Sequence, residues 1–186
     1  MSRKVLACID ASPYAQAVCD YAAWAAKKLD VAMSVIHVLD KSAKPATTDL
    51  SGSIGLGSQE LLLQQLAELD EKHSKLALQR GRLILDAARQ QIEQAGVSSA
   101  DDRLRHGQLL DTLSELESQT RLLVLGKRGF SSADAHGQMG MHVERAIRTL
   151  HKPVLLVQQG YTEPKRIMLA FDGSATALKS VDMLAA

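Results

Sequence analysis

The sequence predicts an α/β fold with an open five-stranded parallel sheet and helices on both faces. Short apolar runs alternate along the chain with longer segments of helical periodicity. The links between the first strand, first helix and second strand are short, so these elements form a βαβ unit with parallel strands and a right-handed crossover. Because the alternation continues to a fifth apolar run, the sheet grows by repeated βα units.

The first βαβ unit occupies the N-terminal forty residues. Val5 to Ile9 has the apolar composition of a buried strand. Ser12 is a typical N-cap and Pro13 a typical first helical residue, and apolar positions at helical spacing then continue to Leu29. Residues 33 to 39 form the second predicted strand.

A polar, glycine-rich segment follows, from residue 40 to residue 58. Its Gly52-Ser-Ile-Gly55-Leu-Gly57 run superficially resembles a dinucleotide fingerprint, but the spacing is wrong and the run does not link a strand directly to a helix. We therefore expect a surface loop, which could act as a flap near a binding site.

A long helix is predicted from about Gln59 to Gln94. Its apolar positions follow a three-and-four spacing, interrupted by His73 and Arg80. Gly81 suggests a bend, and Gly96 is placed to end the helix as the C′ residue. The positions of the apolar stripe are Leu62, Leu66, Leu69, Leu76, Leu83 and Ala87.

The second half of the chain repeats the alternation. Asp102 to His106 is a weak, polar third strand, as expected at a sheet edge, and Leu109 to Leu116 is the next helix. Arg121 to Leu125 is a buried fourth strand. A helical pattern after Gly140 leads to the fifth strand, Val154 to Val157, which we expect at the other edge.

The fourth strand runs directly into a glycine loop. Gly126 and Gly129 allow the backbone to turn sharply and to lie against a ligand without a Cβ atom in the way. Gly140 precedes the start of a helix, where free N–H groups and the positive end of the dipole suit phosphate. Two glycine clusters around one helix start therefore indicate a phosphate cradle.

These motifs resemble the universal stress protein A family. Gly126-x-x-Gly129 followed by Gly140 is similar to its nucleotide loop, and the segments 5–12 and 35–40 are similar to its first two strands. The resemblance covers about residues 3 to 157 and implies a Rossmann-like sheet with strand order 3-2-1-4-5. This chain departs from the family pattern in two ways: the spacer before Gly140 has ten residues instead of nine, and Met141 replaces a Ser or Thr.

The resemblance also implies where ATP, with or without Mg²⁺, would bind. Ligands of open parallel sheets bind at the carboxyl ends of the strands where the strand order reverses, here between the first and fourth strands. Asp10 and the backbone beside Val38 would meet the adenosine, and the glycines and the amides after Gly140 would hold phosphates. The cofactor-binding candidates are Asp10, Val38, Gly126, Lys127, Arg128, Gly129, Gly140, Met141 and His142.

Each of these candidates has a purely structural alternative. Asp10 is also a normal turn or helix-capping residue, and the glycines fit tight turns. The Met141 thioether cannot donate the hydrogen bond that a hydroxyl would give to phosphate. Lys127, Arg128 and a protonated His142 could compensate with charge, or could simply face solvent.

The C-terminal residues repeat the beginning of the chain. With a shift of 162 residues, Asp10 falls on Asp172, Ser12 falls on Ser174, and the apolar run before each aspartate is also repeated. We therefore predict a universal stress protein domain over residues 1–158 and a linker over 159–165. Residues 166–186 would be the first strand and helix of a truncated second domain.

Composition limits the other function classes. The 186 residues carry a net charge of +1, which argues against a general nucleic-acid or anionic-membrane binder. The segment after the start is no signal peptide, and the two cysteines fit reduced thiols in the cytoplasm. Neither metal-ligand spacing nor a set of catalytic acid, base and nucleophile is evident.

Three functions are compatible with this pattern. The chain could be a nucleotide-binding regulatory domain of the stress response, or an interaction module of the same class with an altered pocket. An enzyme of a related nucleotide-binding α/β fold is the third; we expect no enzymatic role, and any ATP hydrolysis to be slow and incidental. We also expect a homodimer through the exposed apolar edge of the last strand.

Overall fold

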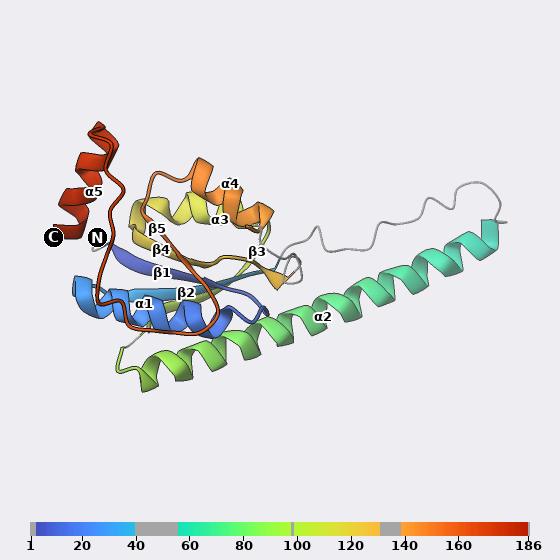
Figure 1. Cartoon of the computed structure of the whole chain (residues 1–186). Coiled ribbons are helices and arrows are strands. Elements are labelled where there is room, and N and C mark those ends of the chain that lie inside the picture. The colour runs from blue at the N-terminus through green and yellow to red at the C-terminus, as the bar shows by residue number, and fades with distance from the viewer. Residues whose placement is uncertain (1–2, 40–55, 98, 131–138, 186) are drawn as a thin grey trace.

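The computed structural model describes residues 3–39, 56–97, 99–130 and 139–185. It contains one parallel five-stranded sheet with the order β3-β2-β1-β4-β5, so the predicted fold class and strand order are confirmed (Figure 1). The strands are β1 (Lys4–Ile9), β2 (Met33–Leu39), β3 (Ser99–His106), β4 (Thr120–Gly126) and β5 (Val154–Val157).

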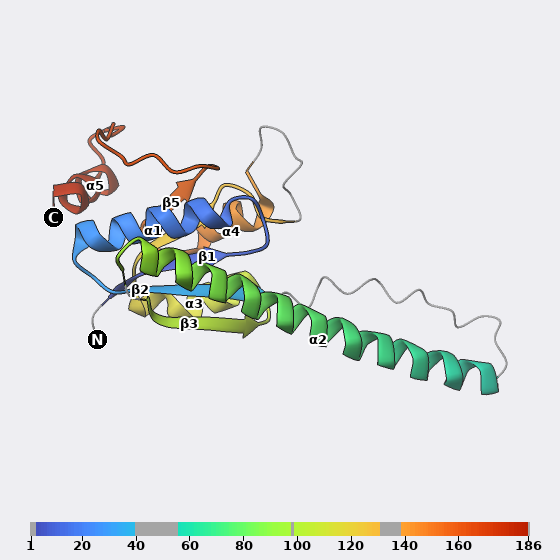
Figure 2. The same ribbon diagram turned by 90° about the horizontal axis from the view of Figure 1, so that it is seen from below.

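Helices cover both faces of the sheet. The helices α1 (Ala15–Leu29) and α2 (Leu56–Gln94) lie on one face, and α3 (Leu109–Leu116) and α4 (Met141–Thr149) lie on the other (Figures 1 and 2). A 3₁₀ turn, Glu117–Gln119, leads into β4. Each face has its own core cluster of buried aliphatic side chains, because β1, β2 and β4 alternate their side chains between the two sides.

The first helix begins later than predicted. Ser12 does not cap it, and Pro13 is not its first residue, because residues 11 to 14 form a turn and α1 starts at Ala15. The Ser12 hydroxyl instead accepts a hydrogen bond from the Tyr14 N–H at 3.3 Å, and the Ser12 carbonyl accepts from Ala15 N–H at 3.2 Å. The extra turn directs Tyr14 into the core, where it is buried.

The long helix α2 contacts the sheet through a different stripe from the leucines singled out in the sequence. Gly81, Leu85, Ala88 and Ile92 are buried, whereas Leu66, Leu69, Leu76 and Leu83 are exposed. The helix is continuous through Gly81, so the suggested bend is wrong. A Cβ atom at Gly81 would lie 2.7 Å from Leu104 Cδ1 and 3.1 Å from His37 Cδ2, so glycine here allows close packing.

The predicted end of α2 is confirmed. Gly96 has a φ of +72°, and its N–H donates to the Glu93 carbonyl at 2.9 Å. The next N–H, of Val97, reaches back to the Ile92 carbonyl at 3.2 Å. This bond pattern with a left-handed residue is the Schellman motif, which glycine adopts with little strain.

Both edge strands lie where the sequence placed them. β3 forms one edge and is longer than expected, because it begins at Ser99 and pairs with β2 over its whole length. β5 forms the other edge and pairs only with β4 among the described residues. The predicted flap over residues 40–55 lies outside the described residues, and residues 56–58 belong to α2.

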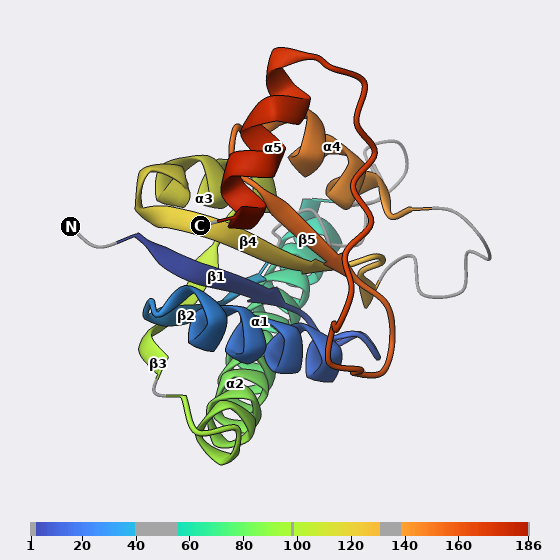
Figure 3. The ribbon, with the colours of Figure 1, turned by 60° about the vertical axis from the view of Figure 1, so that its left-hand side comes forward.

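After β5 the chain passes α1 and ends in a separate helix, α5 (Ala175–Ala185) (Figure 3). The strand predicted before it does not form: residues 161–172 have no regular structure, and Met168 is 96% exposed. A strand needs a neighbour for its backbone hydrogen bonds, and no described strand pairs with this segment. The division into domain, linker and partial second domain therefore stays a prediction.

The repeated aspartate turn is nevertheless present in both places. Asp10 Oδ1 accepts from Ser12 N–H at 3.0 Å, and Asp172 Oδ1 accepts from Ser174 N–H at 2.9 Å. The bonds from Ser174 lower the pKa of the Asp172 carboxyl. Ser174 also caps α5, because its hydroxyl accepts from Ala177 N–H at 3.1 Å. The internal repeat thus has the same geometry at both turns, although only the first turn follows a strand.

Candidate functional site

The strand order brings the main sequence candidates together at the carboxyl ends of the strands. β1 ends at Ile9 and its neighbour β4 ends at Gly126, so Asp10 and the glycine loop lie side by side at the carboxyl ends of these strands. In β2, His37 pairs with Ile9, the last residue of β1. Val38 therefore lies one residue beyond the end of β1, on the same side of the sheet as the carboxyl ends of β1 and β4. From β1 the chain continues through α1, on one face of the sheet, to β2. From β4 it continues through α4, on the other face, to β5. The strand order therefore reverses between β1 and β4.

Asp10 joins the first strand to the glycine loop. While Oδ1 accepts from Ser12, the other oxygen, Oδ2, accepts from the Phe130 N–H at 2.7 Å. One carboxylate therefore holds its own turn and, 120 residues away, the backbone just after Gly129. This fixes the glycine loop against β1, and it is the turn role that the sequence allowed for Asp10.

The first two glycines of the loop are required by close contacts within the protein. A Cβ atom at Gly126 would lie 2.7 Å from Tyr14 Cβ, and one at Gly129 would lie 2.9 Å from Asp10 Oδ2. Both distances are shorter than real carbon contacts allow. The absence of a side chain thus lets β4 pack on the turn before α1 and lets the loop approach Asp10.

The third glycine is held at the other end of the loop. Gly140 N–H donates to the Lys127 carbonyl at 3.1 Å, and Lys127 N–H donates to the Val157 carbonyl at 2.8 Å. These bonds join the end of β5, the end of β4 and the start of α4. The loop therefore closes on itself although its spacer is one residue longer than the family pattern.

Gly140 is the N-cap residue of α4, with extended backbone angles and no side-chain cap. The helix begins at Met141, so the first-turn N–H groups cannot be bonded within the helix. Met141 is 61% exposed and His142 is also exposed, while Lys127 and Arg128 are half-buried. The arrangement offers backbone donors and nearby cationic side chains at the carboxyl ends of β1 and β4, where the strand order reverses.

The structure adds residues that sequence reasoning missed. The Arg80 guanidinium of α2 lies 4.9 Å from the centroid of the Phe130 ring, a cation–π contact between the long helix and the glycine loop. Buried His37 holds the Ile9 carbonyl through Nδ1 at 2.8 Å. Arg80 and Phe130 are 50 positions apart, and no local pattern in the sequence links such pairs.

Comparison with known proteins identifies the family of this fold. A protein-family model described as the universal stress protein family matches residues 1–158. The chain belongs to the universal stress protein family. A universal stress protein of Synechocystis sp. is 38% identical over 185 residues, which is 98% of this chain and 64% of that protein. A universal stress protein of Mycobacterium tuberculosis is 27% identical over 179 residues, which is 91% of this chain and 53% of the relative. The chain therefore spans about half to two thirds of the length of these relatives.

Solved structures of the family have the same fold. A universal stress protein in complex with cAMP superposes with a TM-score of 0.54 at 18% identity, covering 86% of this chain and 98% of that one. The universal stress protein from Archaeoglobus fulgidus in complex with dAMP has a TM-score of 0.52 at 16% identity, covering 83% and 96%. At these identities the similarity is one of fold.

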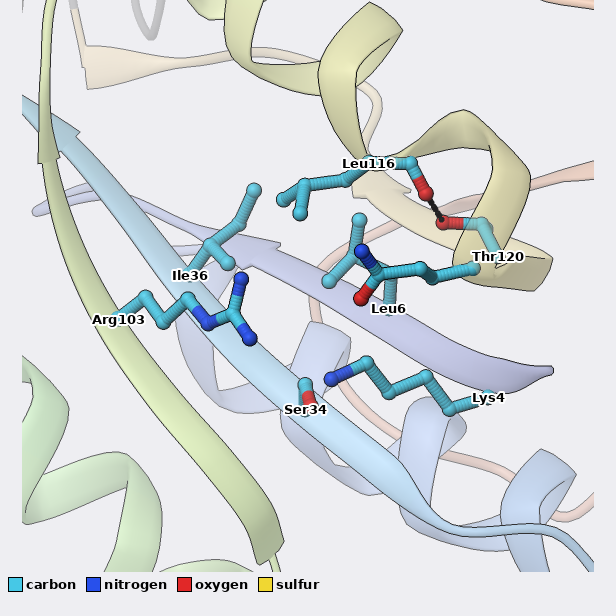
Figure 4. A pocket seen from close by; sticks show the side chains of 8 residues that line it. Lys4, Leu6, Ser34, Ile36, Arg103, Leu116 and Thr120 are labelled. Atoms are coloured by element: carbon cyan, nitrogen blue, oxygen red, sulfur yellow. Dashed lines mark hydrogen bonds between the residues drawn. The ribbon is translucent and has the colours of Figure 1, made fainter. Parts of the chain in front are cut away.

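A second depression in this universal stress protein lies near the amino ends of the strands, away from the candidate site. Figure 4 shows the Lys4 and Arg103 side chains extending over Ser34, whose buried hydroxyl has no hydrogen-bond partner among the described residues. Asp101 pairs with Arg103 and lies 3.6 Å from Lys4 Nζ. The hydrogen bond from Arg103 lowers the pKa of Asp101. Since Asp101 of the protein itself already pairs with both cations, we do not assign a ligand to this depression.

Among the residues that the structure describes, no group of three or more His, Cys, Asp or Glu side chains could hold a metal ion. None of the described helices is both long and apolar enough to cross a membrane.

Proposed function

We propose that this universal stress protein is a regulatory domain that binds an adenine nucleotide, with ATP as the expected ligand, in the stress response. The observation that carries the proposal is the closed glycine loop. Asp10 holds one end of it against β1, and Lys127 holds Gly140 at the start of α4. That geometry places a helix N-terminus and the glycine backbone at the reversal point of the sheet.

Each candidate has a definite part in this proposal. The adenosine would lie at the ends of β1 and β2, beside Asp10 and the backbone at Val38. The phosphates would meet the backbone from Gly126 to Gly129 and the first-turn amides of α4. Lys127, Arg128 and His142 would add positive charge, and Mg²⁺ would be carried by the phosphates. The cAMP and dAMP complexes of structural neighbours support a nucleotide ligand for this fold.

A regulatory role fits the site better than catalysis does. Each Asp10 oxygen already accepts a backbone N–H, which restrains the carboxylate. A general base needs a carboxylate that can reach the reacting group. The loop residues mainly offer donors, which bind phosphate but do not by themselves activate a nucleophile.

A second function is favoured by one observation. Met141 occupies the first position of α4 and is largely exposed, but it has no hydroxyl to offer. With Asp10 already bonded to Ser12 and Phe130, the same geometry would suit an interaction module that binds no nucleotide.

The experiment that separates the two functions changes the charge at position 141. Isothermal titration with ATP and Mg²⁺ is performed on the wild type, Met141→Glu and Met141→Gln. A carboxylate at a helix N-terminus stabilises the helix, so Met141→Glu stays folded, yet it repels phosphate at the same place. We expect Met141→Glu to bind ATP about tenfold or more weakly than Met141→Gln, which has the same shape without the charge.

Two results would reject the nucleotide-binding function. One is the absence of ATP, ADP or AMP binding by the folded wild type. The other is equal affinity of the Met141→Glu and Met141→Gln variants. Met141→Ser tests the missing hydroxyl, and a gain of about 1 kcal/mol in binding free energy is expected if the family geometry is preserved.

A further inference from the structure

Half of α2 extends beyond the sheet. The helix has 39 residues, about 58 Å at 1.5 Å per residue, and its N-terminal half projects away from the rest of the fold (Figures 1 and 2). Every side chain from Leu63 to Ala77 is exposed, and burial against the sheet begins only near Leu78 and Gly81. A helix segment without tertiary contacts is marginally stable in water, and the described residues supply no packing for Leu63 to Ala77.

The projecting half nevertheless has an apolar stripe of its own. Leu62, Leu69, Leu76 and Leu83 recur every seven residues, and Leu66 lies between the first two at the complementary position. A strict seven-residue repeat of this kind is the signature of a seam between two supercoiled helices. Apart from half-buried Leu62, the stripe is strongly exposed, up to 69% at Leu83.

This stripe is not a continuation of the contact with the sheet. The buried positions Gly81, Leu85, Ala88 and Ile92 lie on another side of the helix, because Leu83 and Leu85 are two residues, or about 200°, apart. One helix thus carries two apolar faces. The first is used by the fold, and no described residue buries the second.

Charge is distributed unevenly along the same segment. Glu68, Asp70 and Glu71 form an acidic stretch, and the next eleven residues contain only basic charged residues, among them Lys75, Arg80 and Arg82. Two copies lying antiparallel would place the acidic stretch of each beside the basic stretch of the other. Two parallel copies would place like charges together, with Arg80 facing the same residue of its partner in the seam.

We propose that the Leu62–Leu83 stripe is a self-association surface on which a second copy of this chain docks as an antiparallel helix pair. In the register that pairs complementary seam positions, Leu66 faces the partner's Leu83, and His73 faces the partner's Leu76. Arg80 interrupts the apolar seam, but it faces the partner's Leu69 and not another cation. The Arg80 guanidinium already lies over Phe130 of its own chain.

The two protein bodies are compatible with this pairing. In an antiparallel pair with its centre near Ser74, each sheet lies beside the projecting half of the other chain. The sheet contacts its own α2 through Leu85 and Ala88, on a side that the seam leaves free. The pairing also uses the β3 side of the molecule, opposite the β5 edge.

The test measures distances between spin labels in the full chain. Gln64 lies outside the seam, and Gln64→Cys carries the label. The wild type treated with the same reagent shows whether Cys8 or Cys19 takes up any label. In the antiparallel pair, Gln64 lies opposite the partner's Leu85, so the two labels are 21 residues apart along the axis, about 32 Å. In a parallel pair they would lie side by side, within roughly 20 Å, the width of two helices.

A matched pair of variants connects the distance to the stripe. Leu69→Ser with Leu76→Ser removes two seam leucines, while Gln64→Ser with Ala67→Ser changes two exposed, uncharged residues of the same projecting half on the opposite side. By sedimentation, we expect the seam variant to associate at least about tenfold more weakly than the control, with the labelled seam variant losing the long distance of the antiparallel pair. No distance between labels, a short parallel distance, or equal association of the two variants would overturn the proposal.

Discussion

The Cys19 thiol is a residue whose protonation is set by the fold. It is buried in α1, and burial, with smaller contributions from Asp20 and Asp102, raises its pKa from 9.0 to about 12. The thiolate is the reactive form, so the folded protein should react slowly with iodoacetamide at pH 8 and rapidly in urea. Mass spectrometry of alkylated peptides measures this, and Cys8, whose pKa burial also raises to about 12, should behave in the same way. Fast labelling of the folded chain would contradict it.

The same pKa predicts how stability depends on pH. Between pH 9 and 12 the unfolded thiol loses its proton while the folded one keeps it, so the unfolded state binds fewer protons and stability falls as pH rises. The full contribution is present below pH 9, and the loss is about 1.4 kcal/mol per pH unit for each such thiol. Urea unfolding of the wild type and Cys19→Ala should therefore show a steeper decline above pH 9 in the wild type. Parallel curves would refute the assignment.

Gly126 is the loop residue with the least tolerance for a side chain. Gly126→Ala puts a Cβ atom 2.7 Å from Tyr14 Cβ, which is fixed by the backbone, so the free energy of unfolding should fall by about 1–3 kcal/mol. Gly129→Ala is the comparison, because its new atom meets a carboxylate oxygen of Asp10, which can rotate. A smaller loss is expected there. Urea denaturation checks both, and a fully stable Gly126→Ala variant would show that this contact is not rigid.

At the scale of one element, α2 offers two leucines with opposite environments. Leu85 is 8% exposed and packs in the core, whereas Leu83 is 69% exposed. In dilute solution, where chains do not associate, Leu85→Ala should lower the free energy of unfolding by about 2–4 kcal/mol and Leu83→Ala by less than about 0.5. Urea unfolding of both variants is the measurement. Equal losses would mean that α2 does not pack against the sheet through the face that contains Leu85.

This helix also shows what sequence periodicity can and cannot determine. The three-and-four spacing predicted the helix, and the glycine at position 96 predicted its end. The choice between two apolar stripes depended on shape. Gly81 lets α2 approach Leu104 and His37, and Ala88 is buried on the same stripe, but small residues are a weak signal in a hydrophobic pattern. Ser12 and Pro13 failed as helix start signals because the chain makes one more turn to bury Tyr14.

The candidate site was predictable to a similar extent. The predicted strand ends placed Asp10 and Gly126 side by side at the carboxyl ends of two neighbouring strands. The observed strand order agrees with this prediction, because β1 and β4 are neighbours. The hydrogen bond from Phe130 to Asp10 and the contact of Arg80 with Phe130 were not predictable, because they join residues 120 and 50 positions apart. Only the folded chain brings such groups together.

At the scale of the whole molecule, no described strand pairs with the outer edge of β5, where the sequence predicts a dimer contact. The Pro153 and Val157 carbonyls both accept from β4, at 3.0 Å from Leu123 N and 2.8 Å from Lys127 N. Alternate residues of a parallel strand direct their backbone groups to the same neighbour. Leu155 therefore also faces β4, and Val154 and Leu156 direct their N–H and C=O groups outward.

That alternation determines which proline tests the edge. Leu156→Pro removes an outward N–H and spares the β4 ladder, and proline is tolerated in an edge strand on the solvent side. Leu155→Pro would remove a donor to β4 and should weaken the fold itself. If β5 pairs with the β5 of a second copy, Leu156→Pro should reduce dimerisation by about tenfold or more without lowering the urea midpoint. Sedimentation in the Leu69→Ser, Leu76→Ser background isolates this edge from the α2 stripe, and an unchanged dimer in folded Leu156→Pro would show that the edge is not the interface.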